Sequence, residues 1–241
     1  MSNHHQESQS LPSTPGGGNL SMRLIMICAL LPLASAINYM DRQTLASAAD
    51  RITTELEMSK TEYGWVEGTF GYGFVIGALI FGIIADKFSV RWVYPLVLTC
   101  WSLVTALTAN ATNFEELAAL RFLLGVFEAG HWPCGIRVVR AVVSARGRTM
   151  GNGLLQSGTS VGAVATPLII LSMLSDADGS WRPAFRIIGF AGLAWTVIWF
   201  LVVRKDDFPV VKSRNAADSR DRDNLFRLMT QRNMLVIYAV V

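Results

Sequence analysis

Residues 117–136 read LAALRFLLGVFEAGHWPCGI, an apolar stretch that carries two opposite charges, Arg121 and Glu128. The stretch is long enough to cross the hydrocarbon core of a bilayer, about 30 Å, as a single helix. A charged side chain inside a membrane helix costs about 2.5–3.5 kcal/mol on insertion scales, so it is rarely kept without a use. The two charges lie about two helical turns apart and therefore project from one face. That face must line a cavity or a helix interface.

The composition of the whole chain also indicates a membrane protein. Of its 241 residues, 51% are apolar and 16% are charged, whereas charged residues make up about a quarter of ordinary soluble domains. Six runs are apolar and long enough to span a bilayer: 24–40, 68–85, 92–111, 117–136, 150–174 and 187–203. The sequence therefore predicts an all-α membrane protein with six transmembrane helices.

The distribution of Lys and Arg predicts how the helices are oriented. With the N-terminus inside, the inner segments hold fifteen Lys and Arg residues and the outer loops hold four. Because positive residues are retained on the cytoplasmic side, we expect a cytoplasmic N-terminus. The net charge of +3 reflects this bias, and no nucleic-acid partner is expected.

Four segments are predicted along the chain. Residues 1–21 are rich in Ser, Gly, Pro and Gln and lack the features of a signal peptide, which predicts a disordered cytoplasmic tail. Residues 22–204 form the predicted six-helix transmembrane bundle. Residues 205–232 alternate in charge and contain an amphipathic segment, which is typical of a cytoplasmic linker lying along the membrane surface. Residues 233–241 are the expected start of a truncated seventh helix.

Small residues and prolines within the runs predict how the helices pack. Gly73 with Gly77, and Gly158 with Gly162, form G-x-x-x-G pairs that let helix backbones approach closely. Static packing and sliding of the helices are both compatible with these pairs. Prolines are expected to interrupt three of the runs: Pro32, Pro133 and Pro167.

Enzyme function is not expected, because the sequence shows no nucleophile motif, metal cluster or phosphate loop. All of the cysteines lie within apolar runs, where a thiol behaves as a small apolar side chain: Cys28, Cys100 and Cys134. Neither a disulfide nor a metal site is implied. No cofactor is expected.

The loop between the second and third runs carries a recognisable motif. Gly82, Asp86, Lys87 and Arg91 fit the pattern G-x-x-x-D-[RK]-x-G-x-[RK], which resembles the loop signature of the major facilitator superfamily. Ser89 stands where the pattern has its second glycine, which weakens the match at that turn. The resemblance implies a gating loop whose aspartate accepts hydrogen bonds from backbone amides or a neighbouring Arg and latches two bundle halves. A charged loop that serves only orientation is the alternative.

Further stretches resemble the anion:cation symporter branch of that superfamily. Residues 38–42, NYMDR, are similar to its N-Y-x-D-R signature, and residues 121–133 are similar to its fourth helix. Residues 156–158, QSG, with the proline at 167 look like its fifth helix, where Asn commonly stands in place of Gln156. The resemblance covers nearly the whole chain from residue 38 onward. It implies the N-terminal half of a twelve-helix carrier, similar to bacterial hexuronate and other sugar-acid transporters.

Arg42 is the candidate for binding a substrate carboxylate. An Arg side chain stays charged when it is partly desolvated and presents a planar fork to carboxylate oxygens. Tyr39 lies one helical turn earlier and can offer a hydroxyl to the same ligand. Tyr72 and Gln156 are weaker candidates for binding sugar hydroxyls. The first apolar run stops at residue 40, so an interfacial role for Arg42 stays open.

Charge balance predicts how substrate and proton are coupled. If Asp41, Arg42, Arg121 and Glu128 face one cavity, its net charge is zero, and an added anion makes it negative in a low-dielectric environment. Protonation of a carboxylate removes that repulsion. We expect Glu128 to be the coupling acid, with Asp41 next. His131 either titrates or is simply packed, as its position near a proline favours, and Arg121 either contributes cavity charge or holds helix contacts.

The sequence therefore predicts a proton-coupled symporter for small organic anions, most simply a hexuronate or related sugar acid, in a bacterial inner membrane. Na⁺ as the coupling ion stays open. The expected partners are the anion, membrane lipid and a second six-helix half that the 241 residues do not contain. The alternative is a non-transporting membrane sensor or a remnant six-helix structural bundle.

Overall fold

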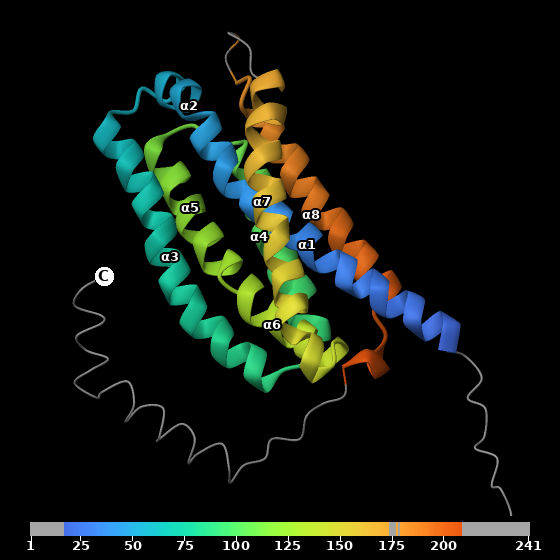
Figure 1. Cartoon of the computed structure of the whole chain (residues 1–241). Coiled ribbons are helices and arrows are strands. Elements are labelled where there is room, and N and C mark those ends of the chain that lie inside the picture. Colours follow the sequence, from blue (N-terminus) through green and yellow to red (C-terminus); the bar gives the residue numbers. More distant parts are fainter. Residues whose placement is uncertain (1–16, 174–176, 178, 209–241) are drawn as a thin grey trace, which may run out of the picture. The chain divides into compact units, whose positions relative to one another are not determined.

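The computed structural model describes residues 17–173, 177 and 179–208, and the regular structure of these residues is helical throughout (Figure 1). Its longer helices are α1 (Gly17–Ser47), α3 (Lys60–Lys87), α4 (Val90–Thr108), α5 (Phe114–Glu128), α6 (His131–Val142), α7 (Arg148–Met173) and α8 (Arg182–Val202). The shorter elements are α2 (Ala49–Glu55), η1 (Ala145–Gly147) and η2 (Lys205–Asp207). The predicted all-α fold is confirmed.

Five helical segments within the described residues are long and apolar enough to cross a membrane: 22–47, 60–87, 90–108, 145–173 and 182–202. The predicted helix over 117–136 is instead divided between α5 and α6, with a turn at Ala129 and Gly130. Pro133 explains the position of this turn, because a proline ring clashes with the carbonyl four residues earlier, which here belongs to Ala129. The expectation of six continuous apolar helices is therefore not met at this place.

The expected interruptions at Pro32 and Pro167 are wrong, because α1 and α7 run through these residues as continuous helices. A proline is tolerated inside a membrane helix when a neighbouring group bonds the carbonyl that it leaves free. Pro95 in α4 shows this arrangement. The carbonyl of Arg91, four residues before Pro95, accepts a hydrogen bond from Nε1 of Trp199 on α8 at 3.0 Å.

The G-x-x-x-G pairs lie at the closest helix contacts. A Cβ atom at Gly73 or Gly77 would overlap backbone atoms of α5, and one at Gly158 would overlap the carbonyl of Pro32 on α1. At Gly162 it would lie 2.6 Å from the carbonyl oxygen of Ala36. Thus α3 packs side by side with α5, and α7 with α1 (Figure 1). The predicted close approach is confirmed.

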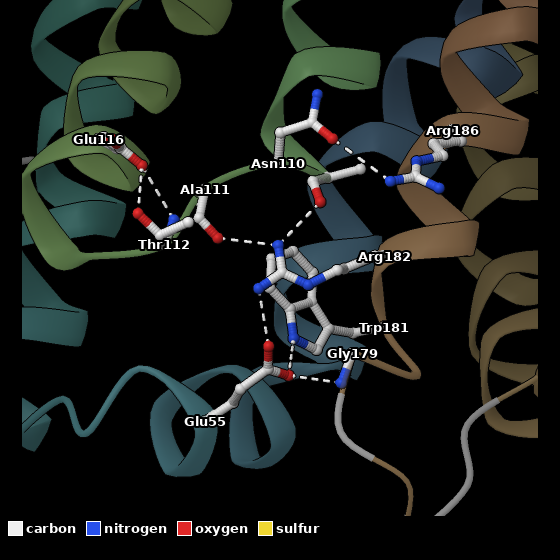
Figure 2. Close-up of polar contacts among 10 residues, drawn as sticks. Glu55, Asn110, Ala111, Thr112, Glu116, Gly179, Trp181, Arg182 and Arg186 are labelled. Atoms are coloured by element: carbon white, nitrogen blue, oxygen red, sulfur yellow. Dashed lines mark hydrogen bonds and ion pairs between the residues drawn. The ribbon is translucent and has the colours of Figure 1, made fainter.

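A network of hydrogen bonds closes the end of the bundle that carries α2 (Figure 2). The Glu55 carboxylate accepts bonds from the Gly179 amide, Trp181 Nε1 and Arg182 Nη2, each at 2.7 Å. Arg182 Nη1 also donates to the carbonyls of Ala109 and Ala111 at 2.8 Å. Three connections far apart in the sequence are thereby tied to one carboxylate. We call these residues the Glu55 network.

The Glu55 network changes the acidity of its central carboxyl group. Partial burial acts to raise the pKa of Glu55, but the bonds from Arg182, Gly179 and Trp181 outweigh it and hold the pKa below the ordinary value of 4.5. Glu55 is therefore ionised at neutral pH and bonded on both oxygens. The guanidinium carbon of Arg182 also lies 4.5 Å from the centre of the Trp181 ring, which adds a cation–π contact.

Two of the predicted segments, the N-terminal tail and the linker, are described in part. The first helix begins at Gly17, inside the segment expected to be a disordered tail. The amphipathic part of the predicted linker and the predicted start of a seventh helix lie outside the described residues. Of the linker, the structure describes η2 and Phe208, whose ring stacks on Trp199 with 6.0 Å between the ring centres.

Candidate functional site

The site begins with the continuation of α1 past the end of its apolar run. The helix extends to Ser47, so Arg42 projects from a regular helix and not from a loop. Arg42 Nε donates a hydrogen bond to Glu128 Oε2 on α5 at 2.9 Å. The Glu128 side chain is completely buried, whereas the Arg42 side chain is 31% exposed. An ion pair with one buried partner thus connects α1 to the end of α5.

Asp41 lies beside this pair and is also buried. Within the described part of the chain, neither of its carboxylate oxygens has a hydrogen-bond partner. The charges of Glu128, Arg121 and Arg42 all act on it, and the Thr105 hydroxyl on α4 lies near its carboxylate without the geometry of a regular hydrogen bond. One turn earlier on α1, the Nδ2 of the buried Asn38 is likewise without a partner in the described residues. These atoms add unmet hydrogen-bonding capacity to the interior of the bundle.

Arg121 completes the charged group from α5. Its side chain is 1% exposed, and its Nη2 lies 3.8 Å from Oε1 of Glu67 on α3. Among the described residues, its Nε and Nη1 have no hydrogen-bond partner. Phe70 lies near both cations, because its ring centre is 5.2 Å from the Arg121 guanidinium carbon and 4.9 Å from that of Arg42. The cations are thus held partly by an aromatic ring.

The structure brings the predicted charges into one cluster, which we call the central charge cluster: Asp41, Arg42, Arg121 and Glu128. Two of its members pair directly, Arg42 with Glu128, whereas Arg121 pairs with Glu67 of α3. Buried polar atoms without partners cost free energy unless something else bonds them. The cluster therefore offers free N–H donors to an anion and free carboxylate oxygens to protons.

His131 lies at the first position of α6, directly after the turn. Its Nε2 is 2.9 Å from Ser35 Oγ, and its Nδ1 is 3.0 Å from Tyr94 Oη. The ring is buried and meets Trp132 edge-on at 4.9 Å between ring centres. Both ring nitrogens are therefore occupied by contacts between α1, α4 and α6. Of the two interpretations of His131 from the sequence, this geometry favours packing.

The other predicted substrate residues lie on three different helices. Tyr39 on α1 is partly buried beside Gly162 of α7, Tyr72 on α3 is 63% exposed, and Gln156 on α7 is exposed. The described residues show no hydrogen bond that ties any of these three to Arg42, the candidate carboxylate-binding arginine. Their assignment as substrate residues stays a prediction.

The motif residues lie at the end of the bundle opposite the Glu55 network. Asp86 and Lys87 form the end of α3, and Arg91 is in the first turn of α4. Asp86 Oδ1 lies 3.3 Å from Nη1 of Arg137 on α6, so a neighbouring Arg does face this aspartate. The Asp86 side chain is 81% exposed, which leaves it open to other partners. A Cβ at Gly82 would meet no atom within 4 Å.

Comparison with known proteins agrees with this geometry. A family model described as Major Facilitator Superfamily matches residues 31–241. The chain belongs to this superfamily. The fold is similar to that of a bacterial homologue of the human lysosomal transporter Spinster in its inward-facing, unoccupied conformation, with a TM-score of 0.68 and 18% identity, covering 82% of this chain and 45% of that one. The chain is therefore a multi-pass membrane protein with the fold of such transporters.

The sequence relatives of this superfamily chain are described as acid transporters. A probable sulfoacetate transporter of Cupriavidus necator is 30% identical over 174 residues, covering 72% of this chain and 40% of the relative. A probable galactarate/D-glucarate transporter of Bacillus subtilis is 32% identical, covering 79% and 42%. The hexuronate transporter of the same organism is 29% identical, covering 79% and 44%. The chain spans about two fifths of the length of these relatives.

Several residues around the central charge cluster were not expected from the sequence. Glu67 immediately precedes the second apolar run, a position typical of an interfacial charge, yet it pairs with the buried Arg121. Phe70 and Phe74 contact the Arg42 guanidinium at 4.9 and 4.8 Å. The two phenylalanines lie one helical turn apart and closely follow an acid, and this pattern in the sequence could have indicated that they contact a cation.

Proposed function

We propose that this superfamily member is part of a proton-coupled symporter for small organic anions, with a hexuronate or related sugar acid as substrate. The observation that carries this proposal is the Arg42–Glu128 pair, with its N···O distance of 2.9 Å, beside buried atoms of Asp41 and Arg121 that lack partners in the described residues. The names of the sequence relatives support the substrate class. Transport by alternating access requires a second six-helix half that packs against this one.

Arg42 is the residue proposed to bind the substrate carboxylate. Its Nε is held by Glu128, while its Nη2 has no partner among the described residues and is available to a ligand. The contact with Phe70 orients the planar group. Arg121 offers two more free donors from the neighbouring helix. Tyr39, Tyr72 and Gln156 are proposed to bind sugar hydroxyls once the two halves enclose the ligand.

Glu128 and Asp41 are proposed to carry the coupling protons. An anion at Arg42 competes with the Glu128 carboxylate for the same guanidinium. If Glu128 takes up a proton, its hold on Arg42 weakens and the anion gains the full positive charge. Asp41, which lies within the same electrostatic environment, can take up a second proton. Binding of the anion and of protons therefore favour each other, as symport requires.

The pair between Asp86 and Arg137 is proposed to act in gating. It links the end of α3 to α6, and its distance of 3.3 Å between exposed or half-exposed side chains makes it weak enough to break and re-form. Lys87, Arg91 and Gly82 belong to the same end of the bundle. We propose that this end faces the cytoplasm of a bacterial inner membrane, together with the N-terminus.

Uptake of radiolabelled glucuronate tests the proposed function. The product of the complete gene should be placed in proteoliposomes without a membrane potential, with an inward pH gradient imposed or omitted. We expect accumulation above equilibrium only with the gradient, and competition by galacturonate but not by glucose. Replacement of the proton gradient by a Na⁺ gradient should not drive accumulation. Absence of uptake and of binding would favour a sensor or a structural bundle.

Cysteine labelling tests the proposed orientation. In a background without Cys28, Cys100 and Cys134, the exposed residues Ser144 and Thr61 lie at opposite ends of the bundle. We expect Thr61→Cys to react with an impermeant thiol reagent added to intact cells, and Ser144→Cys to react only after the membrane is opened. The reverse pattern would place the N-terminus outside.

A further inference from the structure

Glu67 is a charged residue at the central charge cluster to which the proposed transport cycle gives no role. Its Oε1 lies 3.8 Å from Nη2 of the buried Arg121 and accepts a hydrogen bond from Tyr63 Oη at 3.2 Å. Its side chain is 43% exposed, whereas that of Arg121 is 1% exposed. A carboxylate that is open on one side thus faces a buried cation on the other.

The charge of Glu67 reaches the proposed substrate site through neighbouring groups. Phe70 lies one turn after Glu67 on α3, and its ring centre is close to the guanidinium carbons of both Arg121 and Arg42, at 5.2 and 4.9 Å. The two cations therefore share one aromatic side chain. An anion bound to either cation lies within a short distance of Glu67, in an environment where charges are poorly screened.

Counting charges shows what Glu67 changes. With Glu67 included, the group holds three carboxylates and two guanidinium groups. When Asp41 and Glu128 are both protonated, the remaining charge is one positive unit, which a single substrate carboxylate neutralises. Without Glu67 the remaining charge would be two positive units, which matches a dianion. The carboxylate of Glu67 therefore sets how much negative charge the loaded site accepts.

We propose that Glu67 is a specificity-determining residue that restricts the site to organic monoanions and disfavours dianions, which would separate this chain from the relative described as a probable galactarate/D-glucarate transporter. This inference rests on the proposed function and makes its substrate class narrower. The sugar acids glucuronate and glucarate have the same six-carbon skeleton and carry one and two carboxylates. Because glucuronate is mainly a pyranose ring and glucarate is open-chain, the change in their ratio between Glu67 variants, and not the ratio itself, tests valence. A unit charge about 8 Å away, at an effective dielectric constant of about 20–40, changes the affinity for a second unit charge by about tenfold.

The test compares how strongly the two acids inhibit glucuronate uptake by the product of the complete gene. For the wild type, we expect glucarate to inhibit at least tenfold more weakly than glucuronate. In Glu67→Gln, which keeps the length of the side chain and an acceptor for Tyr63, the ratio of the two inhibition constants should fall by about tenfold, mainly because glucarate gains. Glu67→Asp keeps the charge and should keep the wild-type ratio.

A matched control removes an exposed acid from the first turn of α5, whereas Glu67 lies on α3. This acid is Glu115, whose side chain is exposed to solvent, so Glu115→Gln should leave the ratio unchanged. A ratio in Glu67→Gln within twofold of the wild type, or a wild type that prefers glucarate, would overturn this inference and leave the proposed function standing. If neither acid inhibits or is taken up by the wild type, the proposed function itself is wrong, and the inference with it.

Discussion

The Glu55 network and the central charge cluster each pair acids with arginines across distant helices, but they differ in how completely their atoms are bonded. Both oxygens of Glu55 accept hydrogen bonds, three in all at 2.7 Å, and Arg182 donates to two carbonyls as well. In the central charge cluster, by contrast, both oxygens of Asp41 and one oxygen of Glu128 lack partners in the described part of the chain.

This difference separates a structural role from a functional one. A buried ion pair stabilises a fold only when its geometry is good and its remaining donors and acceptors are bonded. The Glu55 network meets that condition and fixes three connections to one another (Figure 2). The central charge cluster does not, so we expect its free energy to fall when an anion or a proton binds. We therefore expect substitutions in the first region to act on stability, and substitutions in the second to act on binding and coupling.

Arg182→Ala should have the largest effect on stability. It removes the ion pair to Glu55 and two bonds to carbonyls, and we expect the free energy of unfolding to fall by about 3 kcal/mol, at the low end of the range for a broken buried pair. Thermal unfolding in detergent measures the loss. Arg186→Ala, one turn further along α8, is the control, because within the described residues Arg186 makes a single bond of 3.3 Å to Asn110, and this variant should lose less than about 0.5 kcal/mol. Equal losses would remove the distinction between the network and an ordinary surface contact.

Arg42→Ala should have the largest effect on binding. Loss of an arginine that pairs with a desolvated carboxylate of the ligand costs about 2–5 kcal/mol, so we expect glucuronate affinity to fall by at least thirtyfold in the product of the complete gene. Arg42→Lys should restore little, since an ammonium group cannot reproduce the planar fork that binds Glu128 and the ligand together. Equilibrium binding of radiolabelled glucuronate measures both. Unchanged affinity in Arg42→Ala would return this residue to a role at the membrane interface.

Local features of the sequence predicted much of the fold. The apolar runs located the helices, and Gly77 and Gly158 predicted two of the close helix contacts, because a missing side chain is visible in the sequence itself. The turn between α5 and α6 could also have been predicted, since Pro133 has no N–H group to donate to the carbonyl of Ala129. The expected interruptions at Pro32 and Pro167 were wrong, because whether a helix tolerates a proline depends on the neighbouring helices, which the local sequence does not show.

Pairings between distant residues were not predictable in this way. Glu55 and Arg182 are separated by 127 positions, and nothing local to either one indicates the other. The partner of Arg121 was missed because Glu67 comes before the apolar run on another helix. The family motifs and the charge-balance argument placed Asp41, Arg42 and Glu128 in one group. The structure shows which of them pair within that group. Sequence patterns thus indicate which charges are buried, while the three-dimensional arrangement decides which of them are bonded.

Glu128→Gln should separate coupling from binding. The amide keeps the shape and an acceptor for Arg42 but fixes the neutral form. We expect exchange of glucuronate across the membrane to continue, while accumulation driven by a pH gradient falls well below the wild-type level, because Asp41 alone still takes up a proton. Counterflow and gradient-driven uptake, measured on the same proteoliposomes, must therefore diverge. Normal accumulation would move the coupling role to Asp41, and normal accumulation in Asp41→Asn as well would exclude proton coupling through this half.

Neutralising one acid in each region should give the smallest effects and the most direct comparison. Glu55→Gln weakens three hydrogen bonds to a charged acceptor, and we expect it to lower the free energy of unfolding by about 2 kcal/mol at pH 7. Asp41→Asn removes a buried charge whose oxygens have no partner in the described residues, so its stability should be unchanged or slightly higher.

The pH dependence gives the same comparison a second measurement. Because the pKa of Glu55 is lower in the folded protein than its ordinary value of 4.5, its contribution is complete above that value and is lost as the pH falls through the folded pKa. Thermal unfolding of the wild type and Glu55→Gln, followed by tryptophan fluorescence from pH 7 to pH 3, should therefore converge below about pH 4.5. Asp41→Asn should not be less stable than the wild type at pH 7, so for this variant we expect no stability difference that disappears at low pH. If Asp41→Asn is the less stable of the two variants at neutral pH, the central charge cluster is bonded as completely as the Glu55 network, and its unmet bonding capacity cannot be what prepares it for an anion.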